Sequence, residues 1–114
     1  MRNTYLIFIA SFIFVLSAQA QSDGCSFATP INVTANCSTP AIGSSAGATQ
    51  TIPGCSGNAD DDVWYEFVAT STSHEITVGA SVGYDPVLQV FSNVCSSLIS
   101  IGCTDNFGTS VDET

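Results

Sequence analysis

Short segments in which hydrophobic and polar residues alternate recur along the chain, and turn-forming residues separate them. The strongest signal spans residues 63–68, where β-branched and aromatic side chains follow a polar, turn-forming run at 58–62. Val63, Tyr65 and Phe67 would share one face of this strand. The same reasoning predicts strands at residues 30–34, 76–80, 87–91 and 98–102, and a weak one at 49–52 within a Ser-, Thr- and Gly-rich loop covering 36–57.

Strand spacing determines the predicted fold class. The predicted strands recur roughly every 10 to 12 residues in the second half of the chain, and no 3.6-residue period persists there. This pattern is typical of an all-β chain, and specifically of an antiparallel β-sandwich or jelly roll. With 114 residues there is room for one such domain.

The first 20 residues have the three parts of a secretory signal peptide. Arg2 is followed by an apolar run at 5–16, interrupted only by Ser11, and by the small-residue end Ser17-Ala18-Gln19-Ala20. The alternative is a membrane anchor, but a bilayer-spanning helix needs about 20 apolar residues. We therefore expect cleavage after Ala20, a single module at 21–114, and a secreted, extracellular or cell-surface location.

The charge balance excludes two classes of partner. The net charge is −9, from ten acidic residues and one basic residue, Arg2, and becomes −10 once the signal peptide is removed. Without Lys or Arg, the mature chain cannot neutralise the phosphates of nucleic acid or of an anionic membrane. We exclude both partners for this acidic chain.

Five cysteines fall in the exported part, where disulfides form readily. Two bridges and one remaining cysteine can be arranged in about fifteen ways, which the sequence does not distinguish. The simplest expectation is local pairing, Cys95 with Cys103 and Cys25 with Cys37, which leaves Cys55 unpaired.

Several segments together resemble a known family. They are Asp61-Asp62-Val63-Trp64-Tyr65-Glu66-Phe67-Val68-Ala69, Tyr84-Asp85-Pro86-Val87-Leu88-Gln89-Val90-Phe91-Ser92, and the turn from Cys95 to Asp105, after an opening at 25–31. Residues 25–114 resemble the pre-peptidase C-terminal type of β-sandwich module found in large secreted bacterial proteins. The resemblance implies a jelly-roll-like sandwich, often beside a type IX secretion sorting domain, whose closing strands are expected beyond Thr114. We expect a fragment of a longer protein, with Asn93 replacing the glycine usual after the Val-Phe-Ser strand.

One apparent catalytic motif has a simpler explanation. Gly43-Ser44-Ser45-Ala46-Gly47 matches the G-x-S-x-G pattern of α/β-hydrolases, and His74 follows in the expected order. That pattern needs a sharp strand-to-helix turn on a large α/β sheet, whereas these residues lie in a predicted loop. His74 has no Cys or His companions at zinc-site spacing. We predict no catalytic residues and no zinc.

The acidic residues raise the question of calcium. Asp60, Asp62 and Asp105 are the candidate ligands, because calcium takes six to eight oxygen ligands and loops at one end of a sandwich supply them. The alternative is that these residues cap turns and keep the chain soluble. Residues 58–62 only partly match an EF-hand loop, since Val63 stands at its glycine position. Calcium is the only cofactor predicted.

The sequence therefore predicts a non-catalytic extracellular module with a binding, adhesion or spacer role. Partners would be other domains of the parent protein, a glycan or a cell-surface protein. Aromatic residues could stack on sugars, as an alternative to forming the core: Trp64, Tyr65, Phe67, Tyr84 and Phe91. The alternative function is an accessory module of a secreted peptidase or glycoside hydrolase whose catalytic domain lies outside this chain.

Overall fold

The computed structural model describes residues 22–106, 108 and 110–114, so the predicted signal peptide lies outside the described residues. The elements, in order, are the 3-10 turn η1 (Cys25–Phe27), β1 (Thr29–Pro30), β2 (Tyr65–Glu66), β3 (Leu88–Ser92), the 3-10 turn η2 (Cys95–Ser97) and β4 (Ile99–Thr104). The described part of the chain contains no α-helix, and none of its segments could cross a membrane as an apolar helix. The prediction of a mostly β chain is confirmed.

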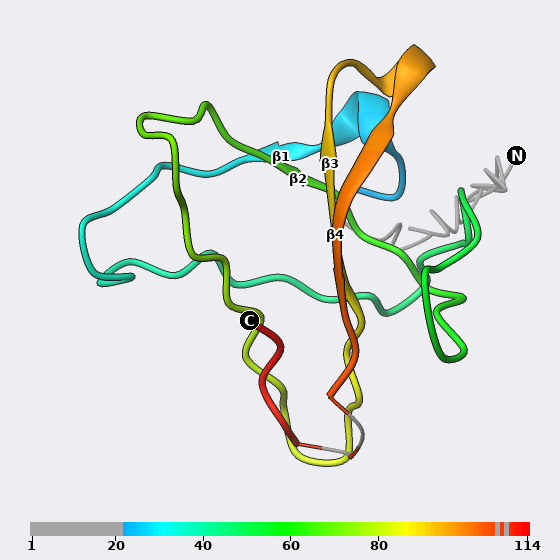
Figure 1. Ribbon diagram of the computed structural model, residues 1–114. Coiled ribbons are helices and arrows are strands. Elements are labelled where there is room, and N and C mark those ends of the chain that lie inside the picture. Colours follow the sequence, from blue (N-terminus) through cyan, green and yellow to red (C-terminus); the bar gives the residue numbers. More distant parts are fainter. Residues whose placement is uncertain (1–21, 107, 109) are drawn as a thin grey trace, which may run out of the picture.

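The best-formed unit is the antiparallel pair β3–β4 (Figure 1). Leu88 pairs with Thr104, and Ser92 pairs with Ile99. A register shift between Val90 and Phe91 marks a β-bulge. Both strands match predicted segments. Asn93, at the end of β3, has a φ of 79°, which asparagine tolerates better than most residues, as expected for a substitute for glycine.

The second sheet corrects the expectation of purely antiparallel pairing. β1 and β2 run parallel, with Thr29 opposite Tyr65 and Pro30 opposite Glu66 (Figure 1). Backbone hydrogen bonds from Thr29 N to Trp64 O and from Ile31 N to Glu66 O, 2.9 and 2.8 Å long, hold this pair together. Both strands are only two residues long, because the intervening chain returns as a wide loop without a second partner strand.

The other predicted strands are weaker in the structure. The segment at 76–80 is reduced to a single antiparallel bridge between Val78 and Glu113, and residues 49–52 form no strand. Residues 31–64 contain neither helix nor strand, as expected for the loop at 36–57. The strand predicted at 30–34 is observed only as β1, and the strand predicted at 63–68 only as β2. A Cβ on Gly43 would collide with the hydroxyl of Tyr65 unless the tyrosine side chain shifted.

The disulfides differ from the predicted pairs. Cys25 is bonded to Cys95 and Cys55 to Cys103, so the local pairs Cys95–Cys103 and Cys25–Cys37 were wrong. Cys37 is the free cysteine, and it is exposed. The bridges span 70 and 48 residues of sequence and tie η1 to η2 and the glycine-rich loop to β4. Distance in the fold, and not distance along the chain, determines which thiols meet.

Apolar burial is small in the described residues. Ala48 is the one buried hydrophobic residue among them, whereas Phe27, Ile42, Val68 and Val82 are 79 to 98% exposed. A domain of this size is ordinarily stabilised by a contiguous apolar core. Here the disulfides and polar contacts replace a large part of that contribution.

Candidate functional site

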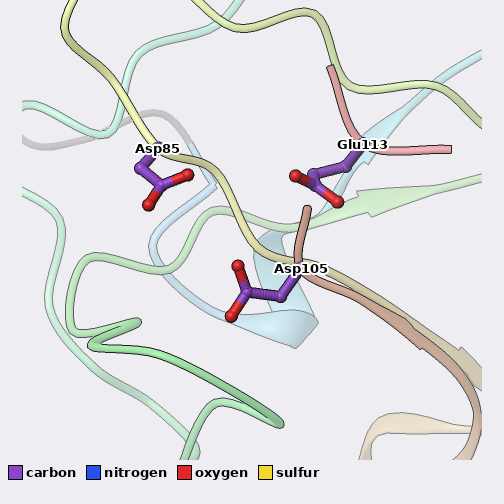
Figure 2. Close-up of side chains that lie close together, drawn as sticks. All are labelled: Asp85, Asp105 and Glu113. Atoms are coloured by element: carbon purple, nitrogen blue, oxygen red, sulfur yellow. The ribbon is translucent and has the colours of Figure 1, made fainter. Parts of the chain in front are cut away.

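Three carboxylates converge at one end of the β3–β4 pair. Ligand oxygens of Asp85, Asp105 and Glu113 all lie within 4.8 Å of one another. In Figure 2 their carboxylates point toward a shared space from three separate segments: the chain before β3, the chain after β4 and the C-terminal segment. We call this group the acidic cluster.

The β-sheet register brings the acidic cluster together. The pairing of Leu88 with Thr104 places Asp85, just before β3, and Asp105, just after β4, at the same end of the hairpin. The bridge between Val78 and Glu113 then brings the C-terminal segment alongside. Both aspartates lie next to predicted strands, so the sequence contained a hint that they could meet. Only the strand pairing shows that they lie at the same end of the hairpin.

Burial differs greatly within the acidic cluster. Asp85 is exposed, Asp105 is partly buried, and Glu113 has no exposed surface. Both carboxylate oxygens of Glu113 accept hydrogen bonds from Asn106 N, at 2.9 and 2.8 Å, and Ser56 Oγ donates to Asp105 Oδ2. No Lys or Arg occurs among the described residues. Chemically, the arrangement offers carboxylate oxygens from three segments, which are the donors that a hard cation prefers.

Only one of the predicted metal ligands belongs to the acidic cluster. Asp105 lies there, whereas Asp60 and Asp62 do not. Asp60 accepts a hydrogen bond from Asn58 Nδ2 at 3.2 Å within its own loop. Asp85 and Glu113 were not among the predicted ligands, because the three acidic residues at 60–62 form a local run in the sequence whereas Asp85 and Glu113 lie far apart.

Asp62 organises a different part of the molecule. Its carboxylate accepts hydrogen bonds from Thr51 N at 2.9 Å, from Ile52 N at 3.2 Å and from Thr51 Oγ1 at 2.9 Å. Trp64 Nε1 also donates to Asp62 Oδ1, at 3.2 Å. Asp62 therefore acts as the turn-capping residue that the alternative to calcium binding predicted.

The residues of the hydrolase-like motif have local structural roles. Ser45 O accepts a hydrogen bond from Ala48 N at 2.9 Å, which closes a turn at residues 46–47, and no helix follows in the described chain. His74 Nε2 accepts hydrogen bonds from Thr70 N and Ser71 N, both at 3.1 Å, and the His74 ring meets Phe67 edge-on. The acceptor nitrogen that a general base would use is thus engaged by the imidazole's own turn.

A small pocket lies beside the Cys25–Cys95 disulfide. It has a volume of about 280 Å³, and we call it the Trp64 pocket after the only tryptophan of the chain. Its apolar lining comes from Phe27, Ile52, Trp64 and Leu98, and Asp23 also belongs to the lining. The Cys25–Cys95 disulfide joins η1 to η2, and both of its cysteines belong to the pocket lining.

Comparisons with family models, with curated proteins and with solved structures found no match to this chain.

Proposed function

We propose that this chain is a non-catalytic module of a secreted or cell-surface bacterial protein, with a binding, adhesion or spacer role. The observation that supports it best is the pair of long-range disulfides in a chain with little apolar burial. Disulfides that close such large loops persist in oxidising compartments and supply stability that a small core does not. The signal-peptide pattern of residues 1–20 agrees with the same compartment.

The local architecture also favours a module without chemistry of its own. The main-chain oxygen of Ser45 closes a turn in a loop, and His74 Nε2 accepts hydrogen bonds from its own loop. The segments that resemble a pre-peptidase C-terminal module, with the opening at 25–31, contain the four strands β1 to β4 of the described residues. The finer proposal is that these strands belong to a jelly-roll-like sandwich of the parent protein.

Export and turnover test this proposal. The full chain, residues 1–114, is expressed in a bacterial host, and the recovered protein is analysed by intact mass before and after thiol alkylation. We expect a mature N-terminus at Gln21, recovery outside the cytoplasm, and one alkylated thiol. A reduced protein retained in the cytoplasm would overturn the proposal.

A panel of peptide, ester and glycoside substrates provides the second arm. We expect no turnover above that of the Ser45→Ala variant. Turnover that disappears in Ser45→Ala would instead establish a hydrolase and contradict the non-catalytic assignment.

A further inference from the structure

The Trp64 pocket offers apolar contact more than directed hydrogen bonds. Phe27 is 79% exposed, and Ile52, Trp64 and Leu98 are partly exposed in the same wall. The pocket is slightly smaller than the ~300–1,000 Å³ typical of sites for drug-sized ligands. Its size suits one large apolar side chain inserted from a partner.

Two polar side chains at the pocket, those of Trp64 and Asp23, are already bonded within the chain. Trp64 Nε1 donates to Thr51 Oγ1 at 3.0 Å, and Thr51 Oγ1 in turn donates to Asp62. Asp23 Oδ1 accepts from Thr49 N at 2.6 Å, and both its oxygens accept from Thr49 Oγ1. A neutral sugar needs several convergent free donors and acceptors, and these internal bonds already occupy the indole N–H of Trp64 and the carboxylate of Asp23. A positively charged group on a partner is attracted to nearby carboxylates without needing a free lone pair.

Charge determines the kind of partner. All ten acidic residues of the chain lie after residue 22, and the one Arg lies before it. Asp23 belongs to the pocket lining, and Asp62 accepts a hydrogen bond from Trp64 Nε1. A field of one sign steers oppositely charged partners and repels like-charged ones, including a second copy of this chain.

We propose that the Trp64 pocket docks a basic polypeptide segment, which inserts an apolar side chain between Phe27 and Trp64 and places a flanking Lys or Arg near Asp23. This inference rests on the proposed function and gives it a partner class. The apolar anchor supplies affinity and the basic flank supplies steering and selectivity, as at other protein interfaces.

Trp64, as the only tryptophan, reports directly on the pocket. The mature, oxidised chain is titrated with a capped pentapeptide that has a phenylalanine between two lysines, and Trp64 emission is recorded. We expect a saturable change whose midpoint weakens at least threefold between 50 and 200 mM salt. Replacing the peptide's phenylalanine with glycine, or its lysines with glutamates, should weaken binding at least tenfold.

Two protein variants and a matched control locate the binding. Phe27→Ala removes a pocket wall, and Asp23→Asn removes a charge while keeping an acceptor oxygen for Thr49. Each should weaken binding at least fivefold. Val82→Ala, at a side chain that is 98% exposed and outside the pocket lining, should not change binding. Circular dichroism checks that each variant keeps the parental fold.

Several results would overturn the inference: no saturable response by the folded chain, equal response to the glutamate peptide, or an unchanged midpoint in Phe27→Ala. A saturable response to an uncharged oligosaccharide in place of the peptide would overturn it in favour of a glycan. None of these outcomes affects export or the absence of turnover, so a failure of this inference is distinguishable from a failure of the proposed function.

Discussion

Trp64 stacks on Phe91, with ring centroids 5.5 Å apart and an angle of 30° between the ring planes. Trp64 immediately precedes β2 and Phe91 lies in β3, so this contact joins the two small sheets. Offset stacking of this kind contributes about 0.5–1.5 kcal/mol beyond the burial of the rings. In a chain with little apolar burial, this pair is a principal contact between the sheets.

Phe91→Ala should therefore lower the free energy of unfolding by about 1–2 kcal/mol, less than for a fully buried phenylalanine because Phe91 is only partly buried. Urea unfolding of the oxidised protein, followed by circular dichroism, measures the loss. Val82→Ala serves as the control, since its side chain is 98% exposed. Equal stability of the two variants would show that the stacked pair does not hold the sheets together.

A second prediction compares substitutions of Asp62 and Asp60, two aspartates of one loop that differ in their hydrogen bonds. Asp62 accepts hydrogen bonds from Thr51, Ile52 and Trp64, whereas Asp60 accepts one from Asn58 Nδ2. Bonds to a charged acceptor contribute about 1.5–3 kcal/mol each in favourable settings and less where water competes. Asp62→Ala should destabilise the protein by about 1–2 kcal/mol, and Asp60→Ala by less than about 0.5 kcal/mol. The midpoints of thermal unfolding compare the two; a larger loss in Asp60→Ala would refute this assignment.

Disulfide connectivity makes a third prediction. A non-reducing digest should yield peptides linking Cys25 to Cys95 and Cys55 to Cys103. Chain-entropy estimates for loops of 70 and 48 residues give about 4 kcal/mol of stabilisation for each bridge. The double variant Cys25→Ser, Cys95→Ser should lose a large part of that amount in urea unfolding. Recovery of a Cys25–Cys37 peptide from freshly purified protein would contradict the structure.

Features of the fold that depend on residues close in sequence could be predicted, whereas contacts between residues far apart in sequence could not. The strands at 88–92 and 99–104 could be predicted because β-branched and apolar residues alternate between clear turn residues. The β1–β2 pair could not, because two-residue strands carry too little pattern to specify a partner or its direction. Loop-closure entropy favours short loops, which is why local cysteine pairs were expected, but the fold brings distant thiols together.

The candidate site likewise could be predicted only in part from the sequence. Asp105 was predicted as a candidate ligand because loops at one end of a sandwich can supply oxygen ligands, and the structure groups it with two other acidic residues. Its companions Asp85 and Glu113 are 20 and 8 residues away in sequence, and only the hairpin register and the Val78–Glu113 bridge bring them close. Proximity of this kind depends on strand pairing, which a single sequence does not specify.

Cys37 leads to a fourth prediction. It is an exposed free thiol, and its φ of 52° places it in a tight turn of the wide loop. Under mild oxidation we expect a disulfide-linked dimer on non-reducing gels, which Cys37→Ser abolishes without lowering the unfolding midpoint. A dimer that persists in Cys37→Ser would show that one of the two structural disulfides exchanges instead.

The last prediction concerns calcium binding. The sequence indicated Asp105 as a calcium ligand, and the structure groups Asp105 with Asp85 and Glu113. Three carboxylates lie within 4.8 Å of one another and have no Lys or Arg among the described residues to offset their charge. A hard cation bound there would stabilise the folded chain by about 1.4 kcal/mol at ten times its dissociation constant. For a domain of this size that corresponds to a rise in melting temperature of roughly 5–10 °C.

The measurement is differential scanning calorimetry of the oxidised protein in millimolar calcium and in EDTA. Asp85→Asn, at the exposed member of the cluster, should abolish the calcium-dependent rise, whereas Asp60→Asn, in a separate loop, should leave it intact. If the melting temperature is the same in calcium and in EDTA, the three acids are a structural feature of the hairpin end and the calcium hypothesis is wrong. If Asp60→Asn abolishes the rise and Asp85→Asn does not, calcium binds at the 60–62 loop that the sequence first indicated.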